Sequence, residues 1–199
     1  MRRPENYLIF IVIILMTGGC AYMSHDVTID PHYTASSAVT GQNRPVSLEV
    51  VDEREDQDIG RRTDMYGMGA LITNEQDVAD VFRSKISEAL KAKGFEANSA
   101  DTFPKLKVEV RAIKYTTSAG IMRGGFLARS AIKIIAKNGS ETYEKMYRSS
   151  VEKKKFFLPF ADSNRTQIND SINEVLEKFF QDESLFKFLA AEPTVEQSS

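Results

Sequence analysis

Four segments of the chain alternate apolar and polar residues at the period of a β-strand, and two others repeat apolar residues at the period of an α-helix. The predicted strands are Val46–Asp52, Lys105–Tyr115, Phe126–Lys137 and Ser140–Lys154. In the second of these, Leu106, Val108, Val110 and Ala112 lie on one side. The segment between 52 and 69 is charged, contains three glycines and shows no regular period, so it is interpreted as irregular.

The first helix is predicted after the capping signal formed by Thr73 or Asn74 with Gln76 or Asp77, and Gly94 is expected to end it. Its apolar arc comprises Val78, Val81, Phe82, Ile86, Ala89 and Leu90. The second helix starts near Asp162 or Ser163 and ends at Phe180, with an arc of Ile168, Ile172, Val175, Leu176, Phe179 and Phe180. Asp182 is expected to cap a last turn that carries Leu185, Phe186 and Leu189.

Asn138-Gly139 is the strongest hairpin signal in the chain. A two-residue turn there places Lys133 opposite Glu144 and Ile135 opposite Thr142. The predicted order is β-α-β-β-β-α. This predicts an α+β fold, a two-layer sandwich in which an antiparallel β-meander has both main helices on one face.

The N-terminus has the pattern of a secretory signal. Arg2 and Arg3 precede the apolar run Tyr7–Met16, and the small residues Thr17-Gly18-Gly19 follow it. Ten residues in a helix span roughly 15 Å, about half of a ~30 Å hydrocarbon core, so a stable membrane-spanning helix is not expected.

Cys20, the only cysteine of the chain, follows directly. The arrangement resembles the bacterial lipobox, in which the cysteine is acylated and becomes the mature N-terminus. Ala21 resembles the pattern of lipoproteins sorted to the outer membrane, which predicts a lipid-anchored protein on its periplasmic side, held by its acyl chains, palmitate among them. The alternatives are a cleaved soluble signal with an incidental cysteine and an uncleaved anchor.

The predicted organisation has four parts. Residues 1–19 are the lipoprotein signal peptide, 20–45 the lipidated N-terminus and flexible tether, 46–190 a single α+β domain, and 191–199 a disordered tail. A strand-like patch around Val27–Ile29 is noted within the tether.

Several segments resemble the YajG family of enterobacterial lipoproteins. They are ALKAKGF at Ala89–Phe95, AIKIIAKNGSETYEKMYRSS at Ala131–Ser150 and INDSINEVLEKFFQD at Ile168–Asp182, together with Asp52–Arg54 and Ile59-Gly60. The resemblance covers most of residues 46–190 and implies an envelope lipoprotein of uncharacterised function. It implies no reaction, because no short catalytic signature defines the family.

Residues 46–190 contain no His, Cys or Trp, because both histidines, His25 and His32, precede them. Histidine-dependent acid–base catalysis, catalytic triads, cysteine nucleophiles and ordinary zinc sites therefore lack their parts. The acidic cluster between Asp52 and Asp58 lacks the spacing of a calcium loop, and Arg54, Arg61 and Arg62 can neutralise it. No metal, cofactor or enzymatic activity is expected.

Charge is distributed unevenly along the chain. Residues 105–155 hold 13 Lys/Arg and 4 Asp/Glu, a net charge of +9. If the helices cover one face of the sheet, the other face is basic, and its expected residues are Arg123, Arg129, Lys133, Lys153, Lys154 and Lys155, with Tyr143 and Tyr147 beside them. Such a surface attracts anionic envelope components or an acidic protein. A solvated face that merely balances the acidic helices is the alternative.

The sequence therefore predicts a lipid-anchored, non-catalytic interaction or structural module that binds no nucleic acid. An alternative is a carrier or chaperone-like module that binds a small or lipidic ligand between helices and sheet, which a cavity lined by Phe82, Phe179 and Phe180 would favour. A third is a carboxylate-based envelope hydrolase, which two carboxylates facing each other in a cleft would favour.

Overall fold

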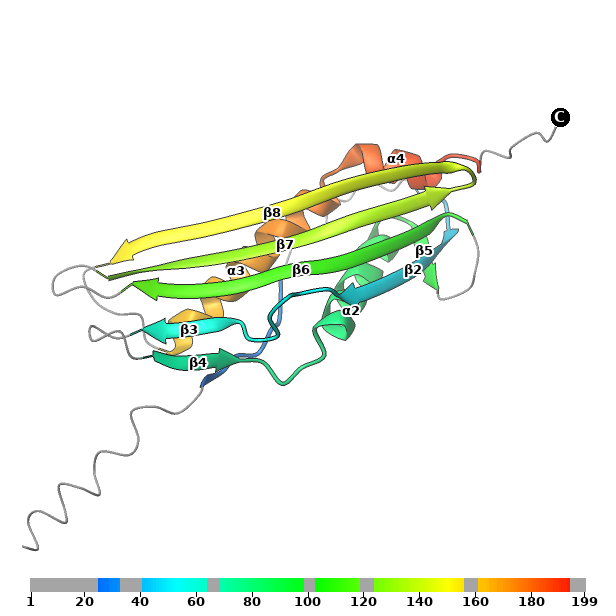
Figure 1. Ribbon diagram of the computed structural model, residues 1–199. Helices are drawn as coiled ribbons and strands as arrows, with labels where there is room; N and C mark the ends of the chain where they lie inside the picture. Colours follow the sequence, from blue (N-terminus) through cyan, green and yellow to red (C-terminus); the bar gives the residue numbers. More distant parts are fainter. Residues whose placement is uncertain are drawn as a thin grey trace, which may run out of the picture.

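The computed structural model describes residues 25–32, 41–63, 69–98, 103–118, 124–155 and 161–193. The chain forms one mixed sheet whose three described helices lie on the same side of it (Figure 1). Its strands are β1 (His25–Asp26), β2 (Arg44–Asp52), β3 (Gly60–Thr63), β4 (Gly69–Thr73), β5 (Phe95–Asn98), β6 (Lys105–Ser118), β7 (Gly124–Asn138) and β8 (Glu141–Lys155). The helices are α2 (Val78–Ala92), α3 (Ala161–Phe180) and α4 (Glu183–Ala190). The predicted α+β class is confirmed.

The topology differs from the predicted meander. Of the four strands predicted from the sequence, β6, β7 and β8 pair consecutively and antiparallel, whereas β2 pairs in parallel with both β5 and β6. The reason is β5, a strand of four residues that is too short to show a period. Helix α2 carries the chain back along the sheet, so β5 returns parallel to β2. The predicted irregular segment also contains a short strand, β3, which pairs with β4 just after the segment.

Strands β2 and β3 share one edge of β6. The first pairs with Lys105–Val110 and the second with Tyr115 and Thr116. Gly60 permits the second pairing, because a Cβ at this position would lie 1.8 Å from the carbonyl oxygen of Tyr115. Between the two pairings, β6 has a bulge between Val110 and Ala112. The bulge reverses which side chains face the helices.

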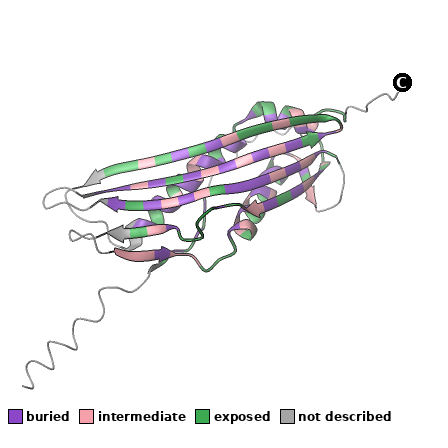
Figure 2. Ribbon diagram, viewed as in Figure 1, coloured by how far each residue is buried: buried purple, intermediate pink, exposed green. Residues whose placement is uncertain are grey.

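The bulge explains why Ala112 does not lie on the same side of β6 as Leu106, Val108 and Val110, as strict alternation along the strand predicted. Before it, Leu106, Val108 and Val110 are fully buried; after it, Ile113 and Tyr115 are buried, and Ala112 is not. Along β6, β7 and β8, buried positions alternate with half-buried and exposed ones (Figure 2). The core therefore lies between the helices and one face of the sheet.

Both predicted helical arcs are confirmed as core. Of the α2 arc only Val81 is half-buried, and all six apolar residues of the α3 arc are at most 1% exposed. Helix α2 begins at Val78 with Asp77 as its N-cap, whose side chain accepts a hydrogen bond of 3.0 Å from Asp80 N. Gly94 follows it at φ 81°, as expected of a residue that ends a helix.

The hairpin register is shifted by two residues from the predicted one. Asn138 pairs with Glu141, so Ile135 lies opposite Glu144 and Lys133 opposite Met146. A shift of two keeps every side chain on its face. Lys133 Nζ still reaches the Glu144 carboxylate diagonally, at 3.0 Å. Asn138 is buried and donates to the carbonyls of Phe188 and Ala191, so it also satisfies the C-terminal end of α4.

Residues 25–32, which we call the N-terminal strap, belong to the folded domain. Val27 is 4% and Ile29 1% exposed. The backbone N–H of Ile29 donates a hydrogen bond of 2.6 Å to the side chain of Gln76, and the backbone N–H of Asp30 donates one of 2.8 Å to the side chain of Asn169 in α3. The folded domain therefore begins before residue 46, the boundary expected from the sequence, because Val27 and Ile29 are buried in its core. Residues 1–24, including Cys20, and 194–199 lie outside the described residues.

Candidate interaction surface

The side of the sheet opposite the helices carries a group of basic residues, which we call the basic face: Lys105, Lys107, Lys114, Arg129, Lys133 and Lys137. Each alternates along its strand with buried residues that face the helices. Strand pairing sets Lys105 opposite Lys137 and Lys114 opposite Arg129. Like charges directly opposite one another destabilise a strand pair, so sheet stability alone does not favour this arrangement.

Acidic residues neutralise part of the basic face. Glu109, only 7% exposed, lies 3.1 Å from both Lys107 Nζ and the Arg111 guanidinium. The hydrogen bond to Glu109 raises the pKa of Lys107. Lys133 pairs with Glu144, and Lys114 pairs with Asp56, whose pKa this hydrogen bond lowers. These four cations are therefore held in place by their own chain.

Two cations of the basic face remain open. Arg129 and Lys137 are exposed and form no ion pair within the described residues. Near Lys137, Lys105 Nζ lies 5.2 Å from the ring centroid of Phe103, which is 46% exposed. A cavity of about 440 Å³ opens here, lined by Ser47, Glu49, Lys105, Leu106, Lys107, Ile135 and Lys137. Since Glu109 neutralises Lys107, the ammonium groups of Lys105 and Lys137 exceed the carboxylate of Glu49 by one charge, which suits an anionic group better than a cation.

The predicted surface residues divide between the two faces. Arg129 and Lys133 lie on the basic face, whereas Lys153 is exposed but pairs with Phe126, on the face toward the helices. Arg123 and the side chains of Lys154 and Lys155 lie outside the described residues.

Tyr143 and Tyr147 are not beside the basic face, as the sequence suggested. They face the helices, and both hydroxyls donate to the carboxylate of Asp182, at 2.9 and 2.7 Å. Lys145, between them on β8, forms an ion pair with the same carboxylate. These four residues form the Asp182 cluster. The sequence signal for it was Tyr-x-Lys-x-Tyr, which puts one lysine on the apolar side of a strand.

Asp182 also caps α4 as predicted, accepting hydrogen bonds from Ser184 N and Leu185 N at 3.0 and 3.3 Å. Burial by itself would raise its pKa, but the donors outweigh burial and hold the pKa well below its usual range. Burial, together with the bond to Asp182, raises the pKa of Tyr147 far above normal. A carboxylate with five donors and a lowered pKa is a poor general base, so we interpret the cluster as structural.

The acidic segment after β2 is likewise satisfied internally. Arg54, 8% exposed, donates to both oxygens of Asp52, at 2.8 and 2.7 Å. Burial acts to raise the pKa of Asp52, but the bonds to Arg54 lower it overall. Within the described residues, no three His, Cys, Asp or Glu side chains are arranged to hold a metal ion.

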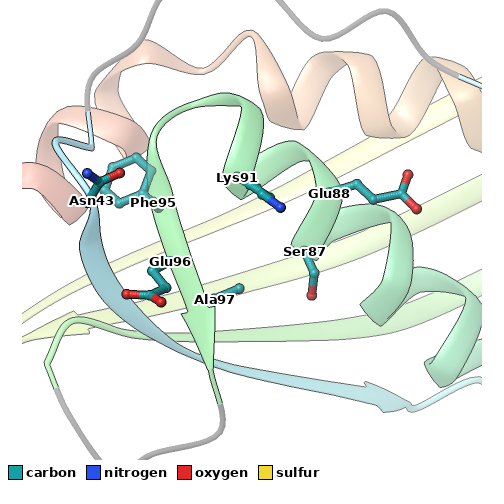
Figure 3. A pocket seen from close by; sticks show the side chains of 7 residues that line it. All are labelled: Asn43, Ser87, Glu88, Lys91, Phe95, Glu96 and Ala97. Atoms are coloured by element: carbon teal, nitrogen blue, oxygen red, sulfur yellow. The ribbon is translucent and has the colours of Figure 1, made fainter.

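A second cavity, of about 650 Å³, lies between α2 and β5 (Figure 3). It is lined by Asn43, Ser87, Glu88, Lys91, Phe95, Glu96 and Ala97. The carboxylates of Glu88 and Glu96 point away from each other (Figure 3). This cavity therefore does not supply the facing carboxylates that a hydrolase of the predicted kind requires.

Comparison with known proteins agrees with the N-terminal pattern. The model of a family described as an uncharacterized lipoprotein matches residues 31–190. The chain belongs to this lipoprotein family. The resemblance to YajG-like lipoproteins is thereby confirmed, and the family indicates a membrane-anchored envelope protein. None of the helices in the described ranges is long and apolar enough to cross a membrane. No curated protein matches the lipoprotein.

Three solved structures are similar to the lipoprotein at low sequence identity. One is an uncharacterized protein (6% identity, TM-score 0.49, covering 80% of this chain and 98% of that one). The second is protein XCC0632 from Xanthomonas campestris, with 12% identity and a TM-score of 0.42; the match covers 81% of this chain and 99% of that one. The third is described as a putative homolog of a neuraminyllactose-binding hemagglutinin, from Helicobacter pylori, with 7% identity and a TM-score of 0.45; the match covers 83% of this chain and 96% of that one.

Proposed function

We propose that this lipoprotein is a non-catalytic interaction module, anchored through lipid on Cys20 to the periplasmic side of the outer membrane, whose basic face binds an anionic component of the envelope. The lipoprotein family supports the anchor, and Cys20 supplies the acylated residue that such proteins need. Acyl chains contribute about 0.8 kcal/mol per buried CH₂, so two or more of them hold a protein stably on a bilayer.

The observation that carries the binding proposal is the pair of open cations on an uncovered sheet face. Arg129 and Lys137 are exposed, and Lys105 and Lys107 line a cavity with Lys137. Ion pairs with acidic residues of the same chain hold Lys107, Lys114 and Lys133 of the basic face. An anionic partner would relieve the repulsion between the opposed lysines Lys105 and Lys137.

The packing of the aromatic residues argues against the carrier alternative. Phe82, Phe179 and Phe180 are at most 1% exposed, and the rings of Phe179 and Phe180 lie 4.6 Å apart. Phe179 also contacts Tyr147 and Phe186, so side chains fill the space between the helices and the sheet that a carrier would need for its ligand. The cavity between α2 and β5 and the cavity beside Lys105 and Lys137 are lined by other residues.

Reversing the two open charges tests the proposal. In cells that produce the full lipoprotein with Arg129→Glu and Lys137→Glu, we expect recovery of crosslinked partners to fall at least fivefold. The reason is that an acidic group now meets the anionic partner. The measurement is in-cell crosslinking followed by identification of the crosslinked components.

The matched control reverses two exposed cations on the helices, Lys91→Glu and Arg165→Glu. It changes net charge by the same amount but leaves the basic face intact, so its crosslinking profile should equal that of the unchanged protein. A profile that is identical in all three proteins, or equally reduced in both variants, would contradict binding through the basic face.

A further inference from the structure

The lateral pairings of the sheet define one row of residues that begins at the N-terminal strap. Each residue of the row is the register partner of the one before it. From β1 through β4, β3, β6 and β7 to β8 the row is His25, Ile72, Gly60, Tyr115, Ala128 and Val151. The row lies close to one end of the sheet. We call this the near end: β3, β6 and β8 finish there, three to four residues beyond the row, and β4 and β7 begin there (Figure 1). The β7–β8 hairpin forms the far end.

The direction of β1 is set by its pairing. It runs parallel to β4, and β4 starts at the near end. The chain therefore enters the strap from the near-end side. From His25 onward it is part of the folded domain, because His25 pairs with β4 and Val27 and Ile29 are buried.

Little chain separates Cys20 from this row. Cys20 precedes His25 by five residues. Fully extended, five residues span at most about 18 Å. In contrast, Asn138 of the far end is ten residues along β7 from Ala128, which corresponds to about 33 Å at strand rise. An acylated Cys20 can bring the near end to a bilayer surface but leaves the far end well beyond it.

We propose that the near end of the sheet stands against the bilayer that holds the acyl chains of Cys20, while the β7–β8 hairpin points away from it. This inference rests on the lipid anchor of the proposed function. The exposed charges between the row and the near end are Arg61, Lys153 and Glu152, an excess of one positive charge that agrees with the same orientation. Basic side chains there are attracted to anionic lipid headgroups.

The orientation has a consequence for the basic face. Arg129 lies beside the row, close to the headgroups, whereas Lys105 and Lys137 with their cavity lie at the far end. The cavity is thus presented roughly 30 Å above the row along the strands. An anionic partner of the cavity is accordingly a component that extends away from the bilayer surface rather than a headgroup.

Two exposed threonines on the face opposite the helices make a matched pair of probes. Thr116 lies next to the row, opposite Leu127, and Thr142 lies at the far end, opposite Lys137. The full lipoprotein carrying Thr116→Cys or Thr142→Cys is labelled with a fluorophore and reconstituted in vesicles of phosphatidylethanolamine and phosphatidylglycerol. We expect a headgroup-attached nitroxide to quench the Thr116 label at least fivefold more than the Thr142 label. Equal quenching, or stronger quenching at Thr142, overturns the orientation.

A spacer variant tests the cause. Twenty Gly/Ser residues inserted after Ser24 add about 25 Å of root-mean-square reach. The difference between the two labels should then shrink to less than twofold; an undiminished difference would refute the role of the short connection. The mass of the N-terminal peptide, measured in the same sample, separates the two proposals. An unlipidated Cys20 overturns the anchor and the orientation together, whereas a lipidated Cys20 with equal quenching overturns the orientation alone.

Discussion

Replacing Asp182 with alanine is expected to lower the free energy of unfolding by about 3 kcal/mol. The substitution removes the N-cap of α4 and leaves the hydroxyls of Tyr143 and Tyr147 without their acceptor. Tyr147 is only 5% exposed, so water compensates less for the lost bond than it would at an exposed hydroxyl. The half-exposed ammonium of Lys145 contributes less, because it can be hydrated. Urea denaturation followed by circular dichroism measures the change.

Glu177→Ala supplies the control for this substitution. Glu177 is exposed on α3, and removing it should change the free energy of unfolding by less than about 0.5 kcal/mol. Equal stability of the Asp182 and Glu177 variants would contradict the structural role of the Asp182 cluster.

The pH dependence gives an independent check on the same cluster. The folded state lowers the pKa of Asp182 below the ordinary value near 3.9. Its stabilisation is therefore complete above about pH 4 and is lost as the pH falls toward the folded pKa. Between pH 6 and pH 3 the unchanged protein should lose more stability than Asp182→Ala does. Parallel losses would contradict the lowered pKa.

Ile29→Ala is expected to cost about 2–4 kcal/mol, because the side chain is 1% exposed and its loss leaves a cavity beneath the strap. The neighbouring Thr28 is exposed, so Thr28→Ala should be neutral within about 0.5 kcal/mol. The same urea titration compares the two. If residues 25–32 were a flexible tether, both substitutions would be neutral, and the short connection between Cys20 and the fold would not exist.

Helices α2 and α3 could be predicted well because each presents six apolar residues at one period, enough to define a face. Strands β3, β4 and β5 have only four or five residues each, which is too few for a period to stand out. Missing β5 led to the wrong direction for β2, because the return of the chain after α2 determines which strands run parallel.

The basic face was predictable in part. The excess of Lys and Arg between residues 105 and 155 indicates such a face, and Arg129 and Lys133 lie on the side of the sheet opposite the helices. The sequence does not show which lysines are neutralised across strands, since Lys114 meets Asp56 of a distant loop. Tyr143 and Tyr147 were assigned to the wrong face because their acceptor, Asp182, lies more than thirty residues away in the sequence.

Intact mass spectrometry of the mature protein from the membrane fraction tests the anchor most directly. We expect a chain that begins at Cys20 and carries the added mass of a diacylglyceryl group and an N-terminal acyl chain, and we expect Cys20→Ala to abolish palmitate labelling. A mature chain that begins at another residue, or a Cys20 with a free thiol, would contradict the lipid anchor.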